Sequence, residues 1–219
     1  RNITHPAATT IQEAQATGKM VLVIEETKKG ESATLLSERL LSHFLNENFI
    51  IEKRTAYAAS AAYLIYDASG ELVHRVAHLP YPFELAVRLK RGLDADNQYY
   101  RLLDRYVKGE RNTALLEQLI TAATDAADDE NRAKVMADYL NALPANVTEA
   151  TLRFVARNTA HSADPGFAFL LNHGKLDTVS TIVFRESFLS HVNDRKLDIQ
   201  ALASSVHRQY DAPALAPYI

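Results

Sequence analysis

Cysteine is absent from the chain, and glycine and proline are sparse, at seven each among 219 residues. Without cysteine, the chain cannot form disulfides, thiolate metal sites or a cysteine nucleophile. Few glycines and prolines favour long regular elements over loops. Long apolar runs are also missing: the longest, residues 20–24 and 61–66, have the length of strands. Neither approaches the roughly 20 residues of a membrane-spanning helix.

A basic surface is lacking as well, because the formal net charge is −3. This balance argues against a nucleic-acid-binding protein, which normally presents a basic face to phosphates. Hydrophobic residues make up 47% of the chain and charged residues 23%, so we expect packed globular structure. The first residue is arginine, which we interpret as the loss of a preceding segment; a secretory signal is one explanation.

The first part of the chain alternates between helical and strand patterns. Helices are predicted over 7–18 (capped by Thr9 or Thr10 and ended by Gly18), over 34–48, and over 83–91 (ended by Gly92). Strands are predicted over 20–24, 49–54, 63–66 and 72–76, with a hairpin turn at 67–70. This order predicts a mixed central sheet flanked by helices.

From about residue 97 the strand patterns almost disappear. Helices are predicted over 97–108, 112–126, 129–142, 147–159, 165–173, 176–192 and 197–210. Short connections between helices of this length predict an all-α region of helical hairpins, similar to a TPR array but without a strict 34-residue repeat. We therefore predict two domains, 1–95 and 96–219.

The segment from residue 18 to residue 92 resembles a thioredoxin domain. Residues 19–24 (KMVLVI) are similar to the K-P-V-L-V-D strand of that family, and 34–41 (TLLSERLL) to the helix behind its active-site turn. Residues 44–50 (FLNENFI) are similar to x-L-N-E-N-F-V, and 63–75 (YLIYDASGELVHR) to T-Y-L-F-L-D-x-x-G-K-V-V-H-R.

The helical second half carries Tyr99, Leu102, Tyr106, Gly109 followed by Arg111, and the run 138–140 (DYL). With these residues it resembles the tail of some secreted bacterial thioredoxin-like proteins. The resemblance implies a thioredoxin-like α/β fold followed by a helical domain, and a periplasmic or otherwise secreted location.

The residues of the redox site are missing from this resemblance. The Trp-Cys-x-x-Cys motif corresponds to residues 29–33, with Gly30 and Ala33 in place of the two cysteines. The family's cis-proline corresponds to Ala61 or Ala62, where a cis bond would cost about 2.5–4 kcal/mol, so we expect a trans peptide. The chain is therefore expected to be redox-inactive and to need no cofactor.

The expected role is protein or peptide binding, or scaffolding, without catalytic or metal-binding residues. Thioredoxin-like surfaces and helical arrays both offer grooves for extended segments. The predicted contact surface consists of Lys28, Lys29, Gly30, Glu31, Ser32, Ala59, Ser60, Ala61 and Ala62.

Two other roles remain open at this point. One is an enzyme with a non-thiol site at the junction of the two domains, using His74, His78 or Glu25. The other is a structural role in which the first domain only anchors the helical array. His74 and His78 are not expected to bind a metal together, because residues four apart on a strand are roughly 13 Å apart. We interpret both as surface or loop histidines.

Polar residues near the first strand have simple structural interpretations. Ser32 is a conceivable nucleophile beside Glu31, but no histidine is placed to activate it. It is predicted instead to cap a helix that begins near Ala33. Glu25 and Glu26 are predicted to be solvated residues at the end of the strand.

Overall fold

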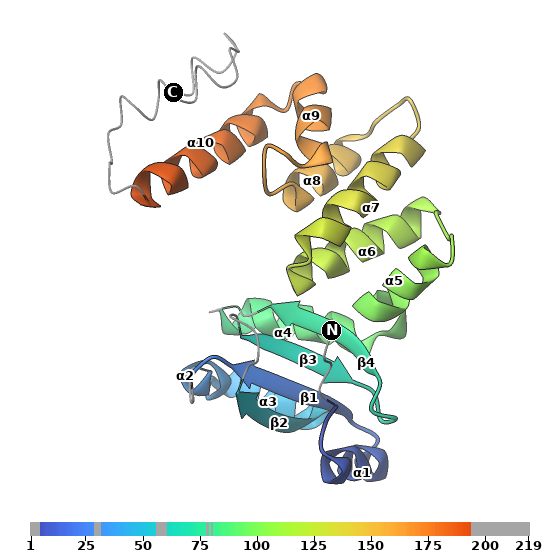
Figure 1. Ribbon diagram of the computed structural model, residues 1–219, viewed down its shortest axis with the longest axis vertical. Helices are drawn as coiled ribbons and strands as arrows, with labels where there is room; N and C mark the ends of the chain where they lie inside the picture. The colour runs from blue at the N-terminus through green and yellow to red at the C-terminus, as the bar shows by residue number, and fades with distance from the viewer. Residues whose placement is uncertain (1–4, 29–31, 56–60, 78, 80, 194–219) are drawn as a thin grey trace. The chain divides into compact units, whose positions relative to one another are not determined.

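The computed structural model describes residues 5–28, 32–55, 61–77, 79 and 81–193 (Figure 1). The helices and strands of its first part are α1 (Ala8–Thr17), β1 (Met20–Glu26), α2 (Ala33–Leu36), α3 (Arg39–Asn48), β2 (Phe49–Thr55), β3 (Ala62–Tyr66), β4 (Leu72–Ala77) and α4 (Pro82–Leu93). These are followed by the 3₁₀ helix η1 (Ala95–Asn97), α5 (Tyr99–Val107), α6 (Thr113–Ala126), α7 (Asp129–Ala142), α8 (Glu149–Asn158), α9 (Pro165–Asn172) and α10 (Leu176–Asn193).

The four strands form one mixed sheet in the order β2-β1-β3-β4. β1 pairs parallel with β2, while β3 pairs antiparallel with both β1 and β4. Within the described residues, β2 therefore has a neighbour on one side only. The predicted architecture, a mixed sheet flanked by helices and followed by a helical region, is confirmed.

Helices cover both faces of this sheet because β1 is apolar on both faces. Leu22 and Ile24 pack in one cluster with Leu41 of α3 and Leu85 of α4. Val21 and Val23 point the other way and pack with Ala14 of α1 and Tyr66 of β3. An apolar strand of this kind is expected in the middle of a sheet, where neither face is exposed to water.

Three predicted helices differ in detail from the observed ones. The helix predicted over 34–48 is divided into α2 and α3, because the backbone of Glu38 is not helical (ψ 129°) and its carboxylate accepts the backbone N–H of Leu41 at 2.9 Å. Gly92 does not end α4 but lies inside it, buried. The caps predicted for α1 were also wrong: Ala7 holds the cap position, although Gly18 ends the helix as expected, with φ +69°.

α5 and α6 pack against β4, the other edge strand of the sheet. The first compact unit accordingly extends from the sheet through these two helices to Arg132. Covering an edge strand in this way keeps its backbone groups from pairing with another chain. Whether residues 1–95 fold as a separate domain stays a prediction.

The second compact unit begins at Ala133, within α7. In it, α9 packs against both α8 and α10, and the rings of Tyr139 and Phe154 meet edge to face at 5.3 Å. Thr148 caps α8 as predicted, by accepting the N–H of Thr151. The helix predicted over 197–210 lies outside the described residues. No helix in the described ranges is both long and apolar enough to cross a membrane.

Candidate functional site

The sheet topology brings the described members of the predicted contact surface, Lys28, Ser32, Ala61 and Ala62, toward one end of the sheet. β1 and β4 run in the same direction, and α2 and α4 begin shortly after these strands end. β3 runs the opposite way and starts at this end, where Ala62 lies between Glu25 of β1 and Ala77 of β4. The candidate site is therefore the sheet end at which β1 and β4 finish and β3 begins.

Glu26 and Ser32 form the buried polar contact of this site. The Glu26 carboxylate is only 7% exposed and accepts the backbone N–H of Ser32 at 3.1 Å. It also accepts the Ser32 hydroxyl. Ser32 holds the N-cap position of α2, which begins at Ala33 as predicted, but its side chain makes no cap bond there. The prediction that Glu26 is solvated is wrong: it joins the end of β1 to the start of α2.

The other predicted contact residues fall into three groups. Lys28 is exposed. Ala61 and Ala62 are buried, with 7% and 2% of their surface exposed, so they offer little side-chain surface to a partner. The described peptide bonds are all trans, including that between Ala61 and Ala62. Lys29, Gly30, Glu31, Ala59 and Ser60 lie outside the described residues.

Three large apolar side chains are exposed at the same end of the sheet. Leu40, the second residue of α3, is 75% exposed, while Tyr81 and Phe83 flank the first residue of α4 with 65% and 82% exposure. α3 and α4 pack against each other on one face of the sheet. We call these three residues the apolar rim. Single exposed apolar residues are ordinary, but a group near a sheet end is typical of an interaction surface.

On the opposite face of the sheet, Glu25 lies 3.8 Å from the guanidinium of Arg54, its register partner on β2. Burial raises the pKa of the nearby Tyr66 hydroxyl, and the charge of Arg54 acts in the opposite direction. Glu25 therefore belongs to an ion pair between neighbouring strands and not to the buried Glu26–Ser32 contact.

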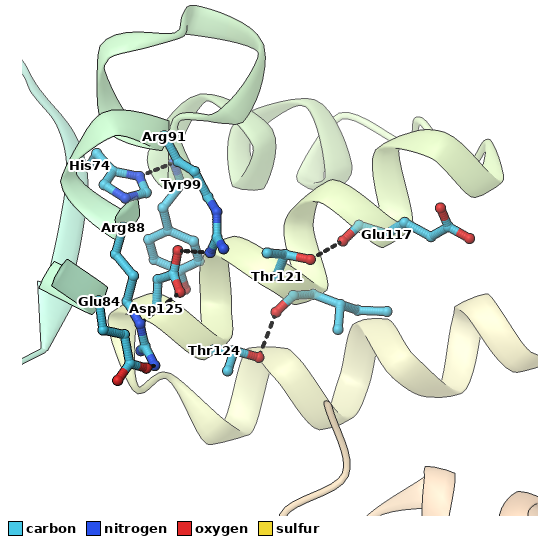
Figure 2. A network of polar contacts seen from close by, with 10 residues as sticks. His74, Glu84, Arg88, Arg91, Tyr99, Glu117, Thr121, Thr124 and Asp125 are labelled. Atoms are coloured by element: carbon cyan, nitrogen blue, oxygen red, sulfur yellow. Dashed lines mark hydrogen bonds and ion pairs between the residues drawn. The ribbon is translucent and has the colours of Figure 1, made fainter. Parts of the chain in front are cut away.

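His74 is fully buried, so its interpretation as a surface or loop histidine is wrong. Its Nδ1 accepts the backbone N–H of Tyr99, the first residue of α5, at 3.1 Å (Figure 2). Burial, with a smaller contribution from the positive charge of Arg91, lowers the pKa of His74 to about 4. His78, its suggested partner, lies outside the described residues.

One acidic residue that was not predicted from the sequence joins two helices beside His74. Asp125 of α6 is 2% exposed and binds Arg91 of α4, while Arg88 of the same helix lies 3.4 Å from its other oxygen (Figure 2). Arg88 also binds Glu84 at 2.5 Å. Burial raises the pKa of Asp125 despite the opposing charges of the two arginines. The helical spacing of residues 84, 88 and 91 was the available signal, since they share one face of α4.

Tyr99 makes a second polar contact in the same region. Its hydroxyl donates to Asp128 at 2.7 Å, and Asp128 in turn accepts the backbone N–H of Asn131 in the first turn of α7. Burial and the hydrogen bond to Asp128 raise the pKa of the Tyr99 hydroxyl. The residues of this network position helices; none of them faces the Glu26–Ser32 contact in a described interaction.

A cavity of about 360 Å³ lies in the second unit between α8 and the start of α10. Glu149 on its wall binds Lys175 at 2.7 Å and Arg153 at 3.3 Å. The hydrogen bonds from Lys175 and Arg153 lower the pKa of Glu149. Glu149, Arg153 and Lys175 are thus paired with one another. Among the described residues, no three histidine or acidic side chains are grouped to hold a metal ion.

Comparison with known proteins adds no relative to this description. No family model, no curated protein and no solved structure matches the chain.

Proposed function

We propose that the chain is a redox-inactive, thioredoxin-like protein that binds a protein or peptide segment at the end of the sheet where β3 begins. The observation that carries the proposal is the apolar rim, three large exposed side chains at the starts of α3 and α4. The thioredoxin-like assignment and the secreted or periplasmic location rest on the sequence resemblance alone and belong to the same proposal.

The chemistry of this sheet end favours binding over catalysis. The Glu26 carboxylate accepts two hydrogen bonds from Ser32, which ties that hydroxyl to a buried acceptor. Since the chain has no cysteine, thiol chemistry is excluded at this place. Exposed aromatic and leucine side chains favour a partner segment that carries apolar residues of its own.

Selection from a displayed library of random peptides tests the proposal, because it requires no identified partner. We expect enriched peptides rich in apolar residues, and Phe83→Ser or Leu40→Ser should weaken their binding to the purified chain at least about tenfold, as for the central residues of many interfaces.

Val107→Ser is the matched control, because Val107 is also apolar, is 74% exposed and lies at the far end of α5. It should leave the affinity unchanged. If no peptide is enriched, or if Val107→Ser weakens binding as much as Phe83→Ser, the apolar rim is not the binding surface.

A further inference from the structure

We propose that the hydrogen bond between His74 and the backbone of Tyr99 is an acid-sensitive contact that holds the start of α5 against β4 only while the imidazole is neutral. Acidification then opens α5 locally, before the sheet itself unfolds. This inference concerns the helices beside β4 and is independent of the proposed binding surface.

The direction of the hydrogen bond fixes the protonation state of His74. A backbone N–H can only donate, so Nδ1 must carry a lone pair, and the proton of the neutral ring lies on Nε2. A second proton would sit on Nδ1 and face the N–H of Tyr99. The attraction would then become a contact between two donors, one of them on a cation.

The surroundings of the ring give no compensation for that second proton. On β3, the register partner of His74 is Ile65, which is apolar. On α4, Gly92 lies so close that an added Cβ would be 2.8 Å from the ring. Buried Nε2 has no hydrogen-bond partner among the described residues.

The positive charge of Arg91 on α4 also opposes protonation of the ring. The carboxylate of Asp125 on α6 is bound to Arg91 and Arg88, and that of Asp94 before η1 accepts the N–H of Asp96 at 3.1 Å. No described carboxylate binds the imidazole, so a charged ring gains nothing by remaining in place.

Tyr99 transmits the contact to a second helix. Its backbone is held by His74, while its hydroxyl donates to Asp128, which caps the first turn of α7. Loss of the His74 contact therefore loosens both the start of α5 and the start of α7. It also uncovers part of β4, the edge strand against which α5 packs.

Hydrogen exchange on the intact chain measures this opening directly. With a pKa of about 4 in the closed state and an ordinary value of about 6.5 after release, the opening equilibrium of α5 should rise about 20-fold between pH 7 and pH 5. Rates must be corrected for the intrinsic pH dependence of exchange. Amides of β1 serve as the internal reference and should open far less often than those of α5.

His74→Asn provides the matched variant, because its carbonyl can accept the Tyr99 N–H but does not titrate. The pH dependence of α5 opening should disappear in it. Opening of α5 that is independent of pH in the wild type, or that persists with the same pH dependence in His74→Asn, overturns the proposal. So does an increase shared equally by β1, which would report global unfolding.

Nitrogen NMR of the wild-type imidazole decides the matter even if His74→Asn fails to fold. The expected result is a ring protonated on Nε2 at pH 7, whose second proton binds as α5 opens. A proton on Nδ1, or titration of His74 without any change in α5, contradicts the proposal.

Discussion

At the scale of single residues, Gly92 illustrates how one missing methyl group permits a close contact. A Cβ at this position would lie 2.4 Å from Ile65 Cδ1 and 2.8 Å from His74 Cδ2. We expect Gly92→Ala to lower the free energy of unfolding by about 1–2 kcal/mol, because overpacking outweighs the better helix propensity of alanine. Urea unfolding measures this change.

Ile65→Val supplies the control, because it removes Cδ1, the nearer of the two obstructing atoms. In that background Gly92→Ala should cost clearly less than in the wild type, giving a coupling energy between the two sites. Equal costs in both backgrounds would show that the close approach of α4 to β3 does not depend on this glycine.

The buried imidazole also predicts how global stability depends on pH. The pKa of His74 is lowered to about 4 in the folded chain, against about 6.5 when unfolded. The unfolded state therefore binds more protons in this window, and the free energy of unfolding contributed by His74 falls as pH decreases from 6.5 to 4. The full loss in the free energy of unfolding across this pH range is about 3 kcal/mol.

Comparison of unfolding curves at pH 7 and pH 4.5 isolates this contribution. The loss should be smaller in His74→Asn than in the wild type, whereas His43→Gln, which removes an exposed imidazole from α3, retains His74 and should retain the loss. A wild-type loss no larger than that of His74→Asn would mean that His74 is not buried in its neutral form.

Buried polar residues such as His74 also show which contacts could not be predicted from the sequence. The burial of β1 and the turn at 67–70 were predicted correctly because both follow from neighbouring residues. The burial of His74 depends on Gly92 and Tyr99, which follow 18 and 25 positions later. Its own strand pattern contains no sign of these contacts. For the same reason, Glu26 was predicted to be a solvated residue at the end of a strand, because its contact with Ser32 forms only in the fold.

At the scale of elements, the buried carboxylate of Asp125 on α6 joins that helix to α4 through its contacts with Arg88 and Arg91. We expect Asp125→Ala to lower the free energy of unfolding by about 1–2 kcal/mol. The variant loses charge-assisted hydrogen bonds, but the two arginines can regain partial hydration. Thermal or urea unfolding measures the effect.

Asp104→Ala is the charge-matched control, since Asp104 binds Lys108 on the exposed surface of α5. An exposed pair of this kind contributes little, so its loss should cost less than about 0.5 kcal/mol. If the two variants cost the same, the Asp125 contact does not help to hold α4 and α6 together.

The division of one predicted helix into α2 and α3 has a physical cause that local patterns do not reveal. Residues 34–48 have helical apolar spacing throughout, which predicts an uninterrupted helix. Glu38 interrupts it, because its carboxylate caps the N–H of Leu41 and its backbone is not helical. Glutamate is a common helix residue, so its role as a cap depends on the turn that α2 makes after Ser32.

For the whole molecule, the packing of α5 and α6 on β4 predicts where the chain can be cut. A fragment of residues 1–132 keeps these helices, whereas 1–95 leaves β4 uncovered and removes the hydrogen-bond donor of His74. We expect 1–132 to be more stable than 1–95 by at least about 2 kcal/mol, from the apolar surface that α5 and α6 bury.

Circular dichroism during urea unfolding compares the two fragments, with the intact chain as reference. Equal stability would instead support the domain boundary predicted near residue 95, and would mean that α5 and α6 contribute little to the folding of the sheet.

The open side of β2 affects how copies of the chain meet at high concentration. If two such strands paired antiparallel around a two-fold axis, opposite residues would share a sheet face. The central register would then bring Glu52 against Glu52. Like charges directly opposite each other destabilise a strand pair. The charge of Glu52 at the centre of β2 thus discourages edge-to-edge pairing of two sheets in this register, although β2 has a described strand neighbour on one side only.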